Sequence, residues 1–507
     1  MSEWEALIAE LERRRAAARA MGGADRLARQ HAGGRLDARG RIAGLVDPGS
    51  FEELALLAGG AEPGGGVPAD AYVCGTARVE GRTVAVGAED FSVMGGSIGV
   101  PGASKRERLA RLAIDERIPF VAILDGAGAR ASKALDRHVP GPIDLQRLAE
   151  ASGLVPTVSL VAGASAGHGA LTAALSDFVV LVEGHGALFS AGPPLVEASI
   201  GERVDKQTLG GARVHAGASG VAQLAVRDEH AGLAAVRRYL GYFPSSAWAW
   251  PPWRGPEQGN DDVARRRLDA IVDLVPANAR RPYDVRPVVE LVADRSSVLE
   301  IQPEWGTGLV TSLVRIGGHA AAVVANQPAV RGGAIDARSA DKAARFIEVA
   351  GSFHLPIVFL ADNPGVLAGS ESERAGILRA AARMYFAQHR VRSPKIHVTL
   401  RKAFGFGAPV MGMNLFDGRT RHYAFPGVSL ATMPARAGGA LAKAGEATRV
   451  ELEAAEAGGP WKLASEASYD DVIDPRDLRD VLIADLDRAA RTRAEGVRPL
   501  RRAGHMP

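Results

Sequence analysis

The sequence predicts an α/β fold built from two copies of one domain. Short runs rich in Val, Ile and Leu alternate with Ala-, Leu- and Arg-rich segments, such as 104–116 and 339–351, that are typical of helices. This alternation predicts parallel strands joined by crossover helices that cover both faces of a sheet. The sequence also contains an internal repeat, which indicates the two copies. Its length of 507 residues favours more than one domain.

The internal repeat has a spacing of 237 to 238 positions. Its clearest matches are IPFVAILDGAGA (118–129) with LPIVFLADNPGV (355–366), and GHGA (167–170) with GFGA (405–408). Matches at so regular a spacing indicate duplication. We therefore expect residues 70–180 and 307–418 to form the same β-rich spiral with flanking helices.

A segment rich in Pro and Gly, YFPSSAWAWPPWRGPEQGNDD at 242–262, lies between the two copies. Proline fits neither a helix interior nor a central strand, so a linker or a cap is expected here. The predicted domains are residues 1–245 and 266–507, with a linker at 246–265. We expect the three Trp residues of this segment to pack rather than to contact a ligand.

Composition excludes several classes of protein. The net charge of +3 gives no indication of nucleic-acid binding. Cys74 is the only cysteine, which excludes an intramolecular disulfide and a cysteine-based metal site, and we expect no bound metal. The pattern of Trp4, Ile8 and Leu11 predicts an amphipathic helix instead of a signal peptide. Without a run of 18 apolar residues, we expect no membrane span and a cytoplasmic location.

The segment GASAG at 163–167 fits the G-x-S-x-G pattern of a serine-hydrolase nucleophile elbow. Asp177, His185 and His215 follow it, so counting residues leaves a Ser–Asp–His order open. In the second copy, however, Ser165 falls on an alanine. A nucleophile needs no duplicate turn that lacks the nucleophile, and this favours another role for the turn.

Both copies share Gly-x-Gly-Ala after a strand, where a helix would begin. Amides at a helix N-terminus carry partial positive charge, and glycine lets a substrate oxygen come close. Two oxyanion-binding turns suit transfer of a group between two carbonyl compounds, each through an enolate-like form. The alternative, that the glycines only permit tight helix–strand packing, stays open. The sequence shows no phosphate-binding P-loop, no well-placed dinucleotide fingerprint and no H-E-x-x-H motif.

Longer segments carry a resemblance to a known family. They include VCGTARVEGRTVAVGAEDFSVMGGSIG (73–99), SDFVVLVEGHGALFSAGPPLV (176–196), VVANQPAVRGGAIDARSADKAARFI (323–347) and SPKIHVTLRKAFGFGAPVMGM (393–413). Over about residues 35–485, the chain resembles the carboxyltransferase β subunit of biotin-dependent acyl-CoA carboxylases, of the propionyl-CoA carboxylase type. The resemblance implies two tandem crotonase-like (ClpP/crotonase) domains, each a β-β-α spiral.

The resemblance also implies the reaction and its partners. A carboxyl group would move from carboxybiotin to the α carbon of an acyl-CoA, the coenzyme A thioester substrate. Biotin would arrive on a separate carrier subunit that works with a biotin carboxylase. The N half of one protomer would bind acyl-CoA opposite the biotin-binding C half of another, in a homo-oligomer such as a hexamer built as a trimer of dimers.

Residue roles follow from the resemblance by position. The oxyanion donors would be the N–H groups of Gly167, His168, Phe406 and Gly407. Acyl-CoA would contact Gly96, Ser97, Gly128, Ala129 and Arg130. Biotin would contact Asn326, Gln327, Pro328, Pro364 and Gly365, and Pro409 falls on a position that helps to select the acyl group.

The chain departs from the family pattern at the donor turns, where His168 and Phe406 stand at positions that the family keeps as glycine. All four donor positions still carry an N–H, so both oxyanion sites can form. Two other hypotheses stay open. The chain could catalyse a related thioester decarboxylation or acyl transfer that uses His168 or Ser165, or it could be an inactive assembly partner. The sequence does not identify the acyl chain.

Overall fold

The computed structural model describes residues 2–60, 66–130, 143–494, 496–500 and 504–506. These form two compact units, one ending at Gly241 and the other running from Tyr242 to Met506. The stretch 246–265 belongs to the second unit. Within the described ranges, no helix is both long and apolar enough to cross a bilayer.

The first unit contains a seven-stranded sheet in the order β1-β2-β3-β4-β5-β7-β9. Its strands are β1 (Glu52–Glu53), β2 (Tyr72–Val79), β3 (Arg82–Glu89), β4 (Phe120–Leu124), β5 (Thr157–Val161), β7 (Phe178–Val182) and β9 (Leu224–Val226). The pairs β1–β2 and β2–β3 are antiparallel and the others are parallel. A separate parallel pair joins β6 (Ala164–Ala166) to β8 (Ala187–Phe189).

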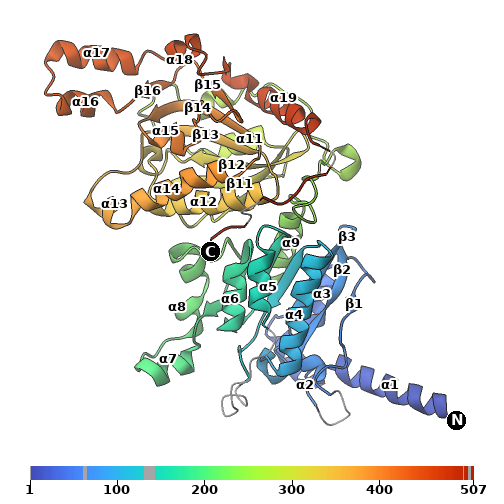
Figure 1. Ribbon diagram of the computed structural model, residues 1–507. Helices are drawn as coiled ribbons and strands as arrows, with labels where there is room; N and C mark the ends of the chain where they lie inside the picture. Colours follow the sequence, from blue (N-terminus) through green and yellow to red (C-terminus); the bar gives the residue numbers. More distant parts are fainter. Residues whose placement is uncertain (1, 61–65, 131–142, 495, 501–503, 507) are drawn as a thin grey trace. The chain divides into compact units, whose positions relative to one another are not determined.

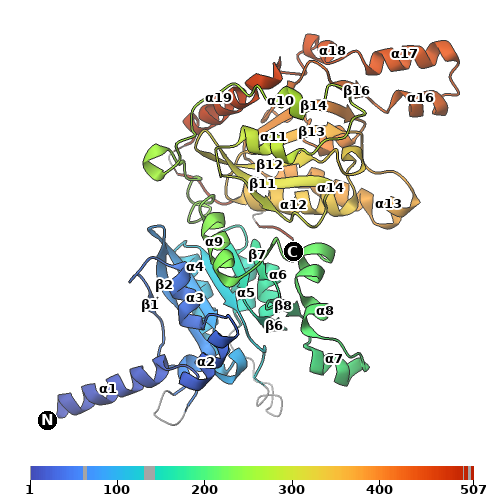
Figure 2. The same cartoon turned by 180° about the vertical axis from the view of Figure 1, so that it is seen from behind.

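Helices cover both faces of this sheet (Figures 1 and 2). The helices of the first unit are α1 (Glu3–Arg19), α2 (Ala24–Ala32), α3 (Ala38–Leu45), α4 (Val100–Asp115), α5 (Asp144–Ala151), α6 (His168–Leu175), α7 (Pro193–Ile200), α8 (Lys206–Gly210) and α9 (Glu229–Leu240). Leu109 of α4, Leu148 of α5 and Ala173 of α6 share one buried cluster with strand residues. The helices α3 and α9 cover the opposite face.

The second unit contains an eight-stranded sheet in the order β10-β11-β12-β13-β14-β15-β17, with β16 paired to the end of β14. The strands are β10 (Leu299–Ile301), β11 (Leu309–Ile316), β12 (His319–Asn326), β13 (Ile357–Asn363), β14 (Lys395–Phe404), β15 (Thr420–Ala424), β16 (Ser429–Ala431) and β17 (Asp471–Val472). The helices are α10 (Ile271–Leu274), α11 (Arg286–Val292), α12 (Ala337–Ser352), α13 (Ser370–Arg374), α14 (Ile377–Arg390), α15 (Gly407–Val410), α16 (Ala435–Leu441), α17 (Glu446–Glu456), α18 (Trp461–Ser465) and α19 (Leu478–Arg491).

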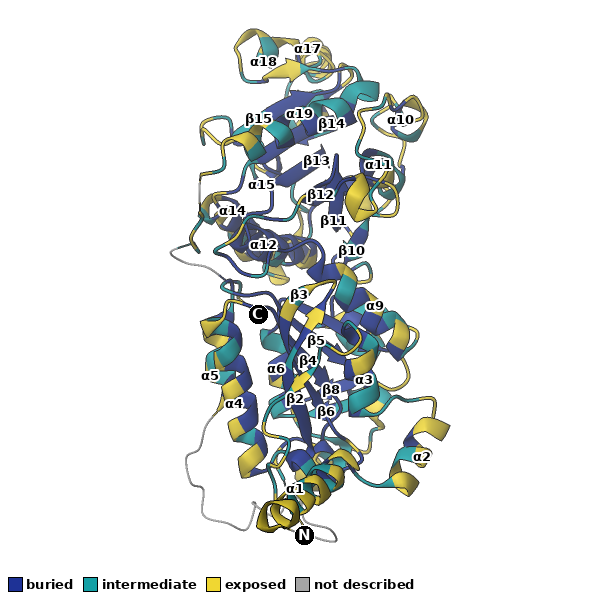
Figure 3. Ribbon diagram, turned by 90° about the vertical axis from the view of Figure 1, so that its right-hand side faces the viewer, coloured by how far each residue is buried: buried dark blue, intermediate teal, exposed yellow. Residues whose placement is uncertain are grey.

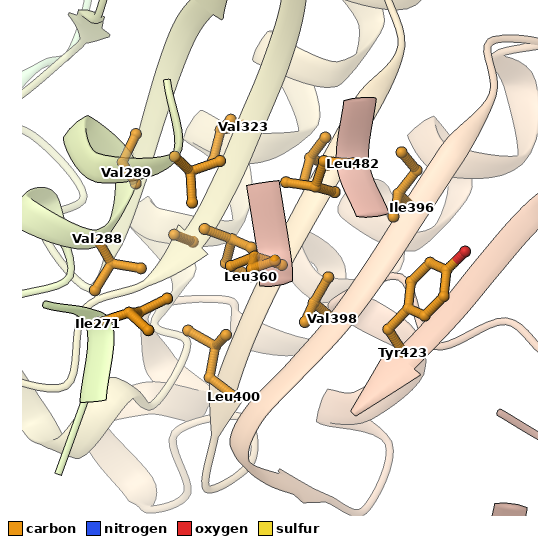
Figure 4. Close-up of a cluster of buried hydrophobic side chains, with 14 of the residues drawn as sticks. Ile271, Val288, Val289, Val323, Leu360, Ile396, Val398, Leu400, Tyr423 and Leu482 are labelled. Carbon is orange, nitrogen blue, oxygen red and sulfur yellow. The ribbon is translucent and has the colours of Figure 1, made fainter. Parts of the chain in front are cut away.

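The core of the second unit lies on both faces of its sheet. Figure 4 shows one side of it, where Val289 of α11 and Leu482 of α19 pack with Leu360 of β13. The helices α12 and α14 pack on the other face (Figures 1 and 2). Because both faces are covered, the central strands β4, β5, β7, β11, β12 and β13 are buried along their whole length (Figure 3).

The predicted duplication is confirmed. The two sheets share the same strand order, and each begins with two antiparallel pairings followed by parallel ones. Isolated bridges join Ile98 to Ala129 and Ile335 to Val366, and both partners are shifted by the predicted 237 positions. The constant spacing of the sequence repeat therefore reflects the same strand topology in both units, including the isolated bridges outside the sheets.

Local sequence signals explain where helices begin. Asp336 caps α12 by accepting from the Ser339 N–H at 2.8 Å, and Asp228 caps α9 by accepting from the Ala231 N–H at 2.7 Å. Such caps satisfy amides that have no partner in the first helical turn, and each contributes about 1 kcal/mol.

A lysine is buried at the same position of each copy. Lys105 Nζ donates to the Ala69 carbonyl at 3.0 Å, and Lys342 Nζ donates to the Gln302 carbonyl at 3.1 Å. Burial disfavours the charged form, which lowers the pKa of Lys105 and brings the pKa of Lys342 to about 7. The unfolded chain, with the ordinary value of 10.5, binds more protons between these limits, so stability increases with pH across this window.

We expect Lys342→Met to remove the part of this pH dependence that Lys342 contributes. Between pH 7.5 and 9.5 the free energy of unfolding of the parent should rise by roughly 2 kcal/mol more than that of the variant. Urea unfolding at the two pH values measures the difference. Parallel pH dependence in both proteins would show that Lys342 does not titrate with a lowered pKa.

Candidate active site

The donor turn of the first unit connects β6 to α6. Gly167 has φ of +56°, a conformation that favours glycine, and it precedes the first helical residue, His168. The Gly167 N–H donates to the Phe189 carbonyl at 2.9 Å, which joins this turn to β8. The glycine therefore turns the chain, and its amide is already occupied.

The first amides of α6 remain open. The first hydrogen bond of the helix runs from the Leu171 N–H to the Gly167 carbonyl at 3.0 Å. Among the described residues, the N–H groups of His168, Gly169 and Ala170 have no acceptor, as expected for the first turn of a helix. These amides carry the partial positive charge of the helix N-terminus.

The second unit repeats the arrangement. Gly405 has φ of +54°, and its N–H donates to the Ala431 carbonyl of β16 at 3.1 Å. The helix α15 begins at Gly407, and the N–H groups of Phe406 and Gly407 have no acceptor within the described part of the chain.

One of the four amides predicted as donors, that of Gly167, is already hydrogen-bonded within the chain. Gly167 matches Gly405, whose amide is equally occupied, so Gly167 is not available as a donor. The pair His168 and Gly169 matches the predicted pair Phe406 and Gly407 instead. The alignment of GHGA with GFGA already contained this register, but the hydrogen bond to β8 was not visible in the sequence.

Both turns require glycine at the second open amide because neighbouring atoms leave no room for a side chain. A Cβ on Gly169 would lie 2.1 Å from Ser165 Oγ. A Cβ on Gly407 would lie 2.6 Å from Asn363 Nδ2 and 2.9 Å from Gly365 Cα. Real Cβ atoms essentially never approach so closely, so a side chain at either glycine would force these neighbouring atoms or the turn to shift.

The residues predicted to bind acyl-CoA come together beside the first donor turn. The bridge between Ile98 and Ala129 aligns the segment 97–99 with 128–130. Arg130 donates to the Ser97 carbonyl at 3.0 Å and forms an ion pair with Asp70 at 2.7 Å. The Ala166 N–H donates to the Gly126 carbonyl at 3.2 Å, which joins this loop to the donor turn. Gly96 and Gly128 lie within the same loops.

The residues predicted to bind biotin divide into two groups. Asn326 donates to the Gly333 carbonyl at 2.9 Å and accepts from the Asp362 N–H at 3.1 Å. Gln327 donates to Asp284 at 2.5 Å. Both side chains are buried, and their amide groups bind the chain itself.

The second group lies closer to the donor turn. Pro364 and Gly365 are half-buried, and Gly365 contacts the position of Gly407. Pro328 is buried directly after Gln327. Pro409 is the third residue of α15, where its missing N–H breaks no helical hydrogen bond.

A buried carboxylate supports each site, and sequence reasoning assigned it no role. Asp125 at the end of β4 forms ion pairs with Arg41 at 2.9 Å and with Arg35. Asp362 in β13 forms an ion pair with Arg401 at 2.6 Å. The repeat matched the two aspartates, but their arginine partners come from elements that the repeat does not align.

A chain of charged groups lies under the first donor turn. Glu89 Oε2 accepts from the Asp125 N–H at 2.6 Å, and Glu89 Oε1 accepts from Arg106 at 2.9 Å. Asp144 Oδ1 accepts from His168 Nε2 at 2.6 Å, and the charge of Arg106 also acts on Asp144. Burial raises the pKa of Glu89. For Asp144, burial acts in the same direction, but the hydrogen bond from His168 and nearby positive charge outweigh it and lower the pKa.

The structure does not support the nucleophile elbow. Ser165 is 0% exposed, and its Oγ has no hydrogen-bond partner among the described residues. Asp177 accepts from the Thr157 N–H at 2.8 Å, and His215 bonds to the Leu188 carbonyl at 2.7 Å. Ser165 is therefore buried without a hydrogen-bond partner in the described part of the molecule, and Asp177 and His215 are bonded to groups other than Ser165.

We expect Ser165→Ala to retain activity within roughly tenfold of the parent, about 1.4 kcal/mol of barrier, because no backbone N–H is lost. The measurement is turnover of the purified variant in the assay proposed below. Loss of all activity in Ser165→Ala, together with labelling of Ser165 in the parent by a fluorophosphonate probe, would support the nucleophile hypothesis instead.

Known proteins of one family are similar to this chain over nearly its whole length. A family model described as a carboxyl transferase domain matches residues 29–503. The chain is 34% identical to the propionyl-CoA carboxylase carboxyltransferase subunit of Haloferax mediterranei, over 94% of this chain and 95% of that protein. It is also 34% identical to the methylmalonyl-CoA decarboxylase subunit alpha of Veillonella parvula, over 93% of this chain and 94% of that one. A crystal structure of transcarboxylase 12S, described as a hexamer assembly with methylmalonyl-coenzyme A and methylmalonic acid bound, matches with a TM-score of 0.89 and 31% identity over 100% of both chains.

Proposed function

The chain belongs to the carboxyl transferase family of acyl-CoA carboxylase subunits, and from this premise we propose that it transfers a carboxyl group from carboxybiotin to the α carbon of an acyl-CoA. The predicted fold class, two tandem crotonase-like domains, is confirmed by the match over the whole chain. The duplicated donor turn is the observation that carries the proposal, because a transfer between two carbonyl groups needs two oxyanion sites.

The first site fits a thioester. The His168 and Gly169 amides would hold the thioester oxygen as the α carbon loses its proton and negative charge moves onto that oxygen. Ser97, Ala129 and Arg130 line the adjoining loop and would position the coenzyme A portion. The donors are backbone groups fixed by the helix, so they need no reorganisation during the reaction.

The second site fits the ureido oxygen of biotin. The Phe406 and Gly407 amides are open, and the buried Asn363 Nδ2 beside them also has no acceptor among the described residues. These three donors would hold the ureido oxygen. Bound carboxybiotin supplies the carboxyl group, and Pro364 and Gly365 would form the adjoining wall.

We propose that biotin arrives on a separate carrier subunit, loaded by a biotin carboxylase, and that the chain assembles as a hexamer. The related transcarboxylase 12S is described as a hexamer, which supports this assembly. The complete site would combine the first unit of one protomer with the second unit of its partner. Sedimentation should then show a dimer-based oligomer, and a fully active monomer would contradict the arrangement.

The test of function is carboxylation with labelled bicarbonate, ATP, purified carrier and biotin carboxylase subunits, and a panel of acyl-CoA thioesters. We propose propionyl-CoA as the first substrate to test, because relatives with whole-chain similarity are named for propionyl- and methylmalonyl-CoA. Label fixed into one acyl-CoA supports the function. Decarboxylation of methylmalonyl-CoA without any carboxylation would favour the alternative reaction.

Pro409 should be varied in the same panel. If it helps to select the acyl group, Pro409→Ala will change the ranking of the acyl-CoA substrates. A uniform change in rate for all substrates would remove Pro409 from selectivity.

A further inference from the structure

We propose that His168 is an acid–base group in the first site, and that this chain catalyses exchange of the acyl-CoA α-proton with water without any biotin carrier. This inference rests on the proposed function, because it assumes that the first donor turn binds an acyl-CoA. It adds an activity that carboxyl transfer does not require.

The position of His168 carries the inference. It is the first residue of α6, and its own N–H is one of the two open amides. A substrate oxygen bound to this amide lies beside the imidazole of the same residue, since only three bonds separate Cα from Nδ1. The side chain is 20% exposed, so the imidazole is held by the protein and still reaches solvent.

Asp144 positions the imidazole. Its Oδ1 lies 2.6 Å from His168 Nε2, and the Asp144 side chain is 4% exposed. A buried carboxylate on one ring nitrogen fixes the orientation and the tautomer of the ring, and it stabilises the imidazolium when the other nitrogen takes up a proton. The charged groups around this pair are Arg106 of α4 and Glu89 of β3, which are themselves joined by an ion pair of 2.9 Å.

The second copy shows that the turn does not need this pair. Phe406 occupies the position of His168, Asn326 that of Glu89, and Ala343 that of Arg106. Phe406 is 55% exposed, and the glycine before it has a φ of +54°, close to the +56° of Gly167. The charged groups are thus an addition confined to the acyl-CoA side.

The exchange balances without a further reactant. Neutral His168 accepts the α-proton through Nδ1, and the electron pair of the broken C–H bond moves into the enolate, whose oxygen is held by the His168 and Gly169 amides. The imidazolium exchanges its proton with water. It then returns a solvent proton to the α carbon, and the thioester is regenerated unchanged except for the isotope.

The experiment follows deuterium uptake at the α carbon of propionyl-CoA in D₂O by mass spectrometry, with the purified chain and no carrier subunit. The parent should exchange the proton, and the rate should rise with pH on a single limb. His168→Phe, which installs the residue of the second copy, should lower the rate by about 10²–10⁴ and abolish that limb. Asp144→Asn should lower the rate and shift the limb. His185→Phe, in an exposed loop of the same unit, is the matched control and should exchange like the parent.

Circular dichroism and propionyl-CoA binding verify that each variant is folded. If His168→Phe does not fold, His168→Asn replaces it in the experiment. Absence of exchange in a parent that carboxylates propionyl-CoA would overturn the inference and leave the proposed function intact. If the parent exchanges the α-proton but cannot carboxylate any acyl-CoA, the result would support the inference and overturn the proposed carboxyl transfer. Equal exchange in the folded His168 variants and the parent would also overturn it.

Discussion

Phe406→Pro is expected to lower carboxylation turnover by about 10²–10³, because it deletes one oxyanion donor and little else. Phe406 has φ of −71°, close to the angle that a proline ring imposes, so the backbone accommodates the ring. Its N–H makes no hydrogen bond among the described residues, so no structural bond is lost. The side chain is 55% exposed, and its removal costs little packing.

Phe406→Ala is the matched control for this prediction. It removes the same side chain and keeps the N–H, so its turnover should stay close to that of the parent. Steady-state carboxylation of both variants, with binding of the carrier measured separately, distinguishes the lost donor from a lost contact. Equal activity of the proline and alanine variants would remove this amide from the reaction.

Gly169→Ala should inactivate the first site by a different route. The new Cβ would lie 2.1 Å from Ser165 Oγ, and Ser165 is fully buried at the start of the turn. Either Ser165 Oγ or the turn must move to relieve this overlap, and a displaced turn would no longer match its N–H groups to the substrate oxygen. We expect turnover to fall by about 10²-fold, since misplacement by 1 Å has costs of this order.

Ser165→Ala should rescue this variant. Without Oγ, the nearest atom of residue 165 to the new Cβ is its own Cβ at 3.5 Å, an ordinary van der Waals distance. The double variant should therefore recover most of the activity, and the two changes should be strongly non-additive. Gly217→Ala, where a Cβ meets no atom within 4 Å, controls for the effect of a methyl group on a glycine of the same unit. A double variant as inactive as Gly169→Ala would show that the overlap is not the cause.

The sequence was sufficient to predict the architecture because the duplication repeats both pattern and spacing. Each buried strand is a run of apolar residues, and 237 positions separate equivalent backbone contacts such as those of Ile98 and Ile335. It also predicted a glycine turn before a helix start at the same place in each copy, since such a turn is a local feature.

The parts that sequence reasoning missed depend on contacts between distant segments. The Gly167 amide is occupied because β8 pairs with β6, and β8 is too short to stand out as a strand in the sequence. Asn326 and Gln327 are buried and bonded to their own chain because β12 lies inside the sheet. Arg41 and Arg401 reach Asp125 and Asp362 from 84 and 39 positions away. No local pattern indicates such pairings.

The open amides at His168 and Phe406 belong to the backbone, and this has a consequence for how the protein can evolve. Substitution of either side chain leaves the N–H in place, so the departure from the family's glycine at these two positions does not delete the proposed oxyanion donors. Selection then constrains the glycines beside them and excludes proline. Each copy could in this way acquire its own side chain next to the reacting atoms, imidazole in one and phenyl in the other, while the shared chemistry of the ancestral domain was preserved.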